Sequence, residues 1–171
     1  MDKTGFDQLV AQLRPKMYRF ALAFVKRHDE AEDVAQDVSL NLWRRRASLS
    51  SLRSVEAYAM SAVKNRCLDY LRSMPGKTDE LTASLHPAHE QTPLAAVEQA
   101  DMVAQVGKLV EGLPVQQQMA IRLRDVEGYE LSEIAEILSM NEGAVRANLS
   151  RARQKIRDQL FKQQQLWMNR K

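Results

Sequence analysis

Apolar residues recur three and four positions apart near the start of the chain, between Phe6 and Phe24. This spacing is typical of an α-helix with one buried face and differs from the two-residue alternation of a strand. Pro15 lies inside the run, so we expect the helix to bend or divide there. The expected buried stripe is Phe6, Leu9, Val10, Leu13, Met17, Phe20, Ala21 and Phe24.

Two further helices are predicted before residue 73. The first begins at Asp29, with Glu32 at the spacing of a capping box, and ends in the arginines 44–46, which complement the helix dipole. The second follows Ser54, a suitable N-cap, and runs to about Arg72. The expected buried residues are Ala31, Val34, Ala35, Val38 and Leu42 in the first, and Tyr58, Ala62, Val63, Cys67, Leu68 and Leu71 in the second.

Residues 73–93 differ in composition from the rest of the chain. Ser, Thr, Pro and Gly dominate this segment and it has no aromatic residue, which is typical of a flexible linker between domains. We therefore expect an all-α protein of two small helical domains, residues 1–72 and 94–171, with little fixed contact between them.

Four short helices are predicted after the linker. The first covers 94–110, with Leu94, Val97, Met102, Val106 and Leu109 as its core. The next has Pro114 at its first position and ends near Gly128. Its expected core is Val115, Met119, Ile121, Leu123 and Val126.

The last two helices have the pattern of a helix-turn-helix. Residues 131–138 form the first helix, Ser139 to Asn141 the turn, and 142 to about 166 the second helix, which Asn141 caps. Ala135 provides the small residue at the helix crossing, and apolar residues flank it. The second helix displays Arg146, Asn148, Ser150, Arg151, Arg153, Lys155 and Arg157, side chains that read base edges or bind phosphates.

Charge follows the same division. Residues 142–171 contain eight Lys/Arg and two Asp/Glu, whereas residues 94–141 contain three and eight, although the net charge of the whole chain is only +3. A basic helix on an acidic scaffold favours a polyanionic partner.

Catalytic and metal-binding patterns are missing from the sequence. There is no Gly-rich phosphate loop, no nucleophile elbow and no paired cysteine, because Cys67 is the single cysteine. His86 and His89 lack the acidic cluster of a metal site, and the acids at residues 29–33 suit a helix N-terminus. We expect no enzyme activity, no cofactor and no metal. Without a signal sequence or an apolar span, we also expect a cytoplasmic protein that does not insert into membranes.

The sequence also resembles a known family. Residues 113–160, from Leu-Pro through Glu-Gly-Tyr and Ile-Ala to Arg-Ala-Arg, resemble region four of RNA polymerase sigma factors, which recognises the minus-thirty-five promoter element. Residues 5–72 resemble region two. There, DEAEDVAQDVSLNLWRRR (29–46) is similar to the segment that docks on the polymerase clamp helices, and AYAMSAVKNRCLDYLR (57–72) to the helix that engages the minus-ten element. With neither a long N-terminal extension nor an intervening domain, the pattern is that of the small extracytoplasmic-function subgroup.

The resemblance implies roles for individual residues. Asp33, Gln36 and Asp37 match positions that bind core polymerase, and they lie on one helix face. Asn65 matches the position that holds an unstacked minus-ten base, and Arg146 and Arg151 match recognition-helix positions. The implied partners are core RNA polymerase, promoter DNA and an anti-sigma factor. The sequence departs from the family pattern at Ala147–Asn148 and at Ser150, which leaves the minus-thirty-five sequence undefined.

Two other functions fit parts of the pattern. A helix-turn-helix regulator with an N-terminal sensor domain would use the basic helix without binding polymerase. A protein–protein adaptor would turn that helix towards an acidic partner. Co-purification with core polymerase would distinguish a sigma factor from such a regulator. Salt-dependent binding to promoter DNA would distinguish a sigma factor from such an adaptor.

Overall fold

The computed structural model describes residues 2–74 and 97–170, except the side chains of residues 97–100, and every regular element in these ranges is helical. Three helices form the N-terminal half: α1 (Lys3–Val25), α2 (His28–Arg44) and α3 (Val55–Ser73), with a 3-10 turn, Leu49–Ser51, before α3. Each of these helices packs against the other two. Their shared core includes Met17, Phe20, Phe24, Leu42 and Met60, each at most 2% exposed.

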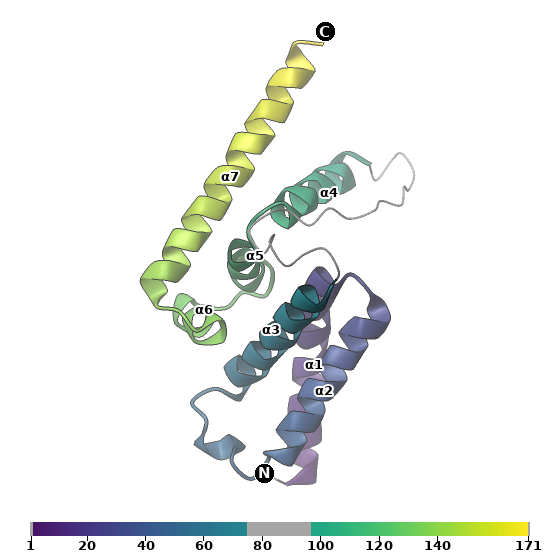
Figure 1. The fold of residues 1–171 in the computed structure, drawn as a ribbon, viewed down its shortest axis with the longest axis vertical. Coiled ribbons are helices and arrows are strands. Elements are labelled where there is room, and N and C mark those ends of the chain that lie inside the picture. Colours follow the sequence, from purple (N-terminus) through teal and green to yellow (C-terminus); the bar gives the residue numbers. More distant parts are fainter. Residues whose placement is uncertain (1, 75–96, 171) are drawn as a thin grey trace.

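The C-terminal half consists of α4 (Val97–Glu111), α5 (Val115–Ile121), a π-helical turn (Arg122–Val126), α6 (Leu131–Leu138) and α7 (Glu142–Met168). Helices α5 and α6 pack against the first turns of α7, and the rest of α7 projects away from α1–α3 (Figure 1). The expected all-α fold with two small helical domains is therefore confirmed. Most of the predicted linker, from residue 75 onward, lies outside the described residues.

Helix α1 continues through Pro15 without a break. Pro15 is on the exposed face of the helix, whereas Leu13 and Met17, two positions before and after it, are buried. Burial of the apolar face therefore outweighs the hydrogen bond that a proline removes.

Several predicted caps agree with the structure. The Ser54 hydroxyl accepts a hydrogen bond from the Ala57 amide at 3.0 Å, and the Asn141 side chain accepts one from the Ala144 amide at 2.7 Å. Asp29 is not an N-cap, because α2 begins one residue earlier and the Asp29 carboxylate pairs with the Arg27 guanidinium at 2.8 Å. Arg27 therefore binds the Asp29 carboxylate, which the sequence pattern predicted would cap the helix N-terminus.

Three positions in the C-terminal half differ from the predictions. Pro114 is the N-cap of α5 and not its first residue. Val126 is 63% exposed, because the π-helical turn, closed by a Glu127 amide to Arg122 carbonyl bond, shifts the helical register by one residue. Met102 is also 63% exposed, since α4 is buried at its C-terminal end, around Val110.

Candidate functional site

The helix-turn-helix is built around a tight turn between α6 and α7. Ser139 has left-handed backbone angles (φ 54°, ψ 47°), a conformation that usually favours glycine. The Met140 amide donates to the Ala135 carbonyl at 3.0 Å, which closes the turn, and the Asn141 cap then starts α7. Ile134, Leu138 and Val145 are buried at the crossing, as the pattern predicts.

Helix α7 turns one apolar stripe inward and leaves two polar flanks exposed. Val145, Leu149 and Ala152 are buried against the rest of the domain. One flank has a spacing of four, three and four residues, and the other of three and four, so each forms a continuous stripe. The first flank is Arg146, Ser150, Arg153 and Arg157; the second is Asn148, Arg151 and Lys155.

These side chains differ in whether they form hydrogen bonds or ion pairs with the rest of the protein. Arg146 pairs with Glu142 at 3.2 Å, and Arg153 with Asp125 of the π-helical turn at 2.8 Å. Asn148 is half-buried and donates to the Ala144 carbonyl at 3.0 Å, so its amide is less available than we expected. Arg151 and Lys155 are exposed and form no hydrogen bond or ion pair with any residue that the structure describes. Arg151 is therefore the best-placed free cation for a polyanion.

The N-terminal half presents a separate polar surface. Asp33 and Gln36 are exposed on α2, on the face opposite the buried Val34 and Val38. Asp37, one turn after Asp33, forms an ion pair with Arg66 of α3. Asn65, next to Arg66, is exposed. The structure thus brings the α2 carboxylates close to the helix that carries Asn65, and the Asp37–Arg66 pair links the two.

The aromatic side chains near this surface are only partly accessible. Trp43 is half-buried, packs edge-on against Phe6 at 5.1 Å between ring centroids, and has the Arg46 guanidinium over its ring at 4.0 Å. Tyr58 and Tyr70 are also half-buried against the core. Cys67 is fully buried, and burial raises the pKa of its thiol to about 12, so it is an inert core residue.

One polar cluster was missed by the sequence analysis because its members come from two helices and from the segment before α6. The Glu56 carboxylate of α3 accepts hydrogen bonds from Lys16 of α1 and from the Tyr129 hydroxyl, each at 2.6 Å. Burial pushes the Glu56 pKa upward, but these two hydrogen bonds outweigh it and hold that pKa below its usual value. Burial, together with the nearby Glu56 carboxylate, raises the pKa of the Tyr129 phenol. No local spacing in the sequence connects these three positions.

Metal sites and membrane spans were sought in the same ranges. Residues 2–74 and 97–170 contain no cluster of three or more His, Cys, Asp or Glu side chains that could hold a metal ion. His86 and His89 lie outside the described residues. Among the described helices, none is both long and apolar enough to cross a bilayer.

Comparison with known families gives two separate matches, one in each half of the chain. Residues 9–74 match the family described as Sigma-70 region 2, and residues 104–156 match Sigma-70, region 4. The chain is 27% identical over 155 residues to the ECF RNA polymerase sigma factor SigM of Mycobacterium tuberculosis, covering 91% of this chain and 76% of that one. It is also 27% identical to the RNA polymerase sigma-H factor of Pseudomonas aeruginosa, covering 91% and 86%.

Two solved structures have a similar fold. The sigma factor RpoE of Bartonella quintana, in complex with the anti-sigma factor NepR, has a TM-score of 0.67 at 22% identity, covering 91% of this chain and 96% of that one. CnrH, in complex with the cytosolic domain of CnrY, has a TM-score of 0.64 at 23% identity, covering 93% and 89%. Both similarities extend over the two helical halves.

Proposed function

We propose that this chain, which belongs to the sigma-70 family of RNA polymerase sigma factors and to its extracytoplasmic-function subgroup, divides promoter recognition between its two helical domains. It is a sigma factor: it binds core RNA polymerase and directs transcription to start at specific promoters. The observation that carries the proposal is that one chain combines an acidic α2 surface, beside Asn65, with an exposed basic helix-turn-helix.

The polymerase-binding surface is assigned to α2. Asp33, Gln36 and Asp37 share one face, and no apolar side chain has to leave the core for them to be reached. Asp37 would exchange Arg66 for a basic group of the polymerase. Because the pair with Arg66 is half-exposed, it stabilises the fold only weakly, and its loss would lower the stability of the protein only slightly.

DNA contacts are assigned to both halves. Asn65 on α3 would hold an unstacked base of the minus-ten element, at a cost in stacking energy of a few kcal/mol. The first turns of α7 would enter the major groove at the minus-thirty-five element, with Arg146, Ser150 and Arg151 nearest the bases. Arg153, Lys155 and, after rearrangement, Asn148 would contact phosphates or sugars along the flanks.

Domain boundaries, location and partners complete the proposal. The polymerase and minus-ten functions belong to residues 1–72, the linker to 73–93, and the minus-thirty-five function to 94–171. We place the protein in the cytoplasm with the polymerase, without enzymatic activity of its own. An anti-sigma factor is a proposed third partner, supported by the similar sigma factor RpoE, whose structure was solved with the anti-sigma factor NepR.

Polymerase binding by α2 is tested with the double variant Asp33→Ala, Asp37→Ala. We expect it to compete for core polymerase at least tenfold less well than the wild type while keeping its helical content, because both carboxylates lie outside the core. The measurement is competition between labelled wild type and the variant for a limiting amount of core polymerase, followed by transcription from genomic templates.

Arg66→Ala is the matched control, because it breaks the same Asp37–Arg66 pair and leaves both carboxylates in place. It should bind core polymerase as well as the wild type does. If the double variant binds core polymerase as well as the wild type does, α2 is not part of the interface. If Arg66→Ala loses as much core binding as the double variant, the loss comes from a disturbed fold and not from the missing carboxylates.

A further inference from the structure

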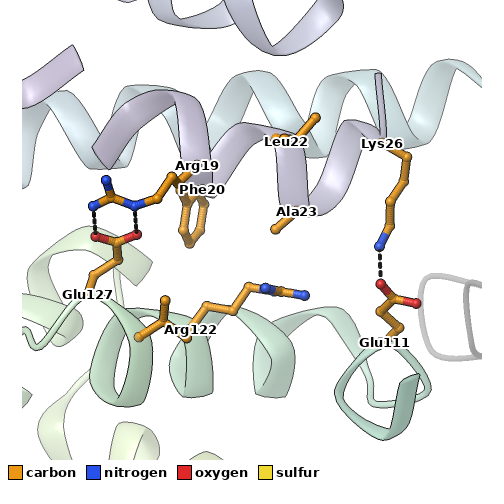
Figure 2. Close-up of a pocket in the computed structure, with 9 residues that line it drawn as sticks. Arg19, Phe20, Leu22, Ala23, Lys26, Glu111, Arg122 and Glu127 are labelled. Atoms are coloured by element: carbon orange, nitrogen blue, oxygen red, sulfur yellow. Dashed lines mark hydrogen bonds and ion pairs between the residues drawn. The ribbon is translucent and has the colours of Figure 1, made fainter. Parts of the chain in front are cut away.

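A cavity of about 420 Å³ lies between α1 and the C-terminal half (Figure 2). Phe20, Leu22 and Ala23 of α1 line it, and Glu111 of α4 and Arg122 of the π-helical turn lie on the opposite side. Small-molecule sites in proteins have volumes of about 300–1,000 Å³, so this cavity is large enough to hold a ligand. None of the described residues that line it belongs to α2, α3 or α7, to which the proposed function assigns the polymerase and DNA contacts.

Two ion pairs lie at the ends of the cavity. The Glu127 carboxylate accepts two hydrogen bonds from the Arg19 guanidinium, at 2.8 and 3.2 Å, and the Glu111 carboxylate accepts one from the Lys26 ammonium at 2.5 Å (Figure 2). Each of these pairs is neutral as a unit. The charge that the cavity presents to a ligand is therefore set by the remaining ionised side chain, Arg122, and it is positive.

The Arg122 guanidinium forms no hydrogen bond or ion pair with any residue that the structure describes, and its Nε is buried. In Figure 2 it lies between the two ion pairs, and it is 5.8 Å from the centre of the Phe24 ring. Burial lowers the pKa of this guanidinium, although the nearby Glu111 carboxylate partly opposes the effect. A cation that has lost water is costly without an acceptor, so this side of the cavity favours an anionic group.

Glu111 presents the complementary group to the same cavity. Its Oε1 accepts from Lys26, whereas its Oε2 is buried and has no hydrogen-bond partner among the described residues. An ionised carboxylate can only accept hydrogen bonds, so Oε2 requires a donor, and Arg122 does not donate to it. Buried polar atoms that the protein leaves unpaired are usually satisfied by water or by a ligand. A molecule between these two groups must therefore both accept and donate hydrogen bonds.

An organic anion fits this cavity better than water does. A water molecule would satisfy Arg122 Nε and Glu111 Oε2, but it would leave the positive charge uncompensated. It would also gain nothing from the apolar surface of Phe20, Leu22 and Ala23. A molecule that combines an anionic group, a hydrogen-bond donor and an apolar body would engage all three parts of the cavity wall.

We propose that this cavity is a binding site for a small carboxylic acid that has an apolar body and a hydroxyl or amino group. The carboxylate of the ligand pairs with Arg122, and its hydroxyl or amino group donates to Glu111 Oε2. The apolar body packs against Phe20 and Ala23 of α1. The site belongs to the chain itself and does not depend on polymerase or DNA.

The test is a titration of the full-length chain with 4-hydroxybenzoate, which has all three features of the proposed ligand. Backbone amide resonances of the isotope-labelled protein should shift around Phe20, Ala23, Glu111 and Arg122 and saturate with a dissociation constant of about 1 mM, as is usual for so small a molecule. The neutral analogue 4-hydroxybenzamide should bind about tenfold more weakly, because it cannot pair with the guanidinium. Benzoate, which lacks the donor for Glu111, should bind about threefold more weakly.

Two variants change the site in different ways. Arg122→Met removes the charge but keeps a long side chain, and it should weaken binding of 4-hydroxybenzoate about tenfold while leaving the thermal midpoint unchanged or higher, because an uncompensated cation is lost. Ala23→Leu keeps every charge but fills part of the cavity, and it should weaken binding by a similar factor. Arg27→Met is the matched control, since Arg27 is exposed, pairs with Asp29 and does not line the cavity. It should bind as the wild type does.

The proposal is wrong if 4-hydroxybenzoate does not bind saturably, or if Arg122→Met and Ala23→Leu both leave its affinity unchanged. It is also wrong if 4-hydroxybenzamide or inorganic phosphate binds as tightly as 4-hydroxybenzoate, because the cavity would then not select an organic anion. An equal loss of binding in Arg27→Met would assign the effect to the overall charge of the protein and overturn the site. If the chain fails to support transcription, the proposed function fails, while these titrations still decide whether the cavity binds a ligand.

Discussion

Among the exposed residues of α7, Arg151 combines position in the first turns of the helix with freedom from other described residues. Arg146 and Arg153 must first break their ion pairs with Glu142 and Asp125 to bind DNA. Because these pairs are exposed, breaking them costs little free energy. The protein has therefore kept one cation unengaged at the place where a major-groove helix meets DNA.

Arg151→Ala should weaken promoter binding by the holoenzyme. A lost base contact costs about 1–3 kcal/mol and relaxes specificity at one position, whereas a lost phosphate contact lowers the salt dependence by about one unit for all sequences. The measurement is the dissociation constant on promoter variants at several salt concentrations. Lys162→Ala, exposed further along α7, is the control and should have little effect. If Arg151→Ala leaves the affinity and its salt dependence unaltered, Arg151 does not contact the DNA.

Local side-chain chemistry explains which single residues the sequence could predict. Ser54 and Asn141 were predicted as caps correctly because a cap and its amide lie three residues apart. Asp29 failed as a cap because Arg27, two residues away, competes for the same carboxylate. Asn148 lies on the predicted helix, but its bond to the Ala144 carbonyl depends on a rotamer that no spacing reveals.

At the scale of elements, helical periodicity was a reliable guide where one face is continuously buried. All five residues expected to be buried on α2 are buried, and α6 has the predicted bounds. The prediction failed at Val126, where a π-helical turn changes the period, and at Met102, which is 63% exposed on the part of α4 before its buried C-terminal end. Both failures have the same cause: amphipathic periodicity assumes a regular helix with a partner along its whole length.

The unbroken helix α1 gives a prediction about stability. Pro15 cannot donate a hydrogen bond to the preceding turn, and its own side chain is exposed, so the proline ring adds no buried packing that would offset this loss. Pro15→Ala should raise the free energy of unfolding by about 2 kcal/mol, which is less than the full helix cost of proline because alanine also gains freedom in the unfolded chain. Urea unfolding measures this change. Gln12→Ala, one turn earlier and exposed, should change stability by less than about 0.5 kcal/mol; a stability loss in Pro15→Ala would mean that the ring packs favourably.

For the whole molecule, the sequence predicted two helical domains but also little fixed contact between them, and the second expectation was wrong. The contacts between the halves pair residues such as Arg19 with Glu127 and Glu56 with Tyr129, which are far apart in sequence and polar. An analysis of hydrophobic periodicity predicts that polar residues are exposed to solvent. The polar contacts between the halves therefore leave no trace in that pattern, whereas each domain core does.

The same polar contacts make the junction between the two halves sensitive to acid. The Glu56 pKa is held below its usual 4.5, so the ionised carboxylate is favoured while Glu56 contacts Lys16 and Tyr129. The stabilisation is fully present above about pH 4.5 and is lost as the pH falls through the lowered pKa. The groups that face Glu56 are the Lys16 ammonium of α1 and the neutral Tyr129 phenol, whose raised pKa keeps it protonated.

The contact between Glu56 and Tyr129 can be followed with spin labels on Arg53→Cys and Ser132→Cys, two exposed sites that lie three residues from Glu56 and Tyr129. The distance between these labels should stay short near neutral pH and lengthen below pH 4.5. Glu56→Gln is the control, because glutamine keeps the shape and an acceptor oxygen but has no proton to gain. It should be more open at neutral pH, since the attraction to Lys16 is lost, and its response to acid should be smaller. An acid response of equal size in wild type and Glu56→Gln would show that Glu56 does not couple the two halves to pH.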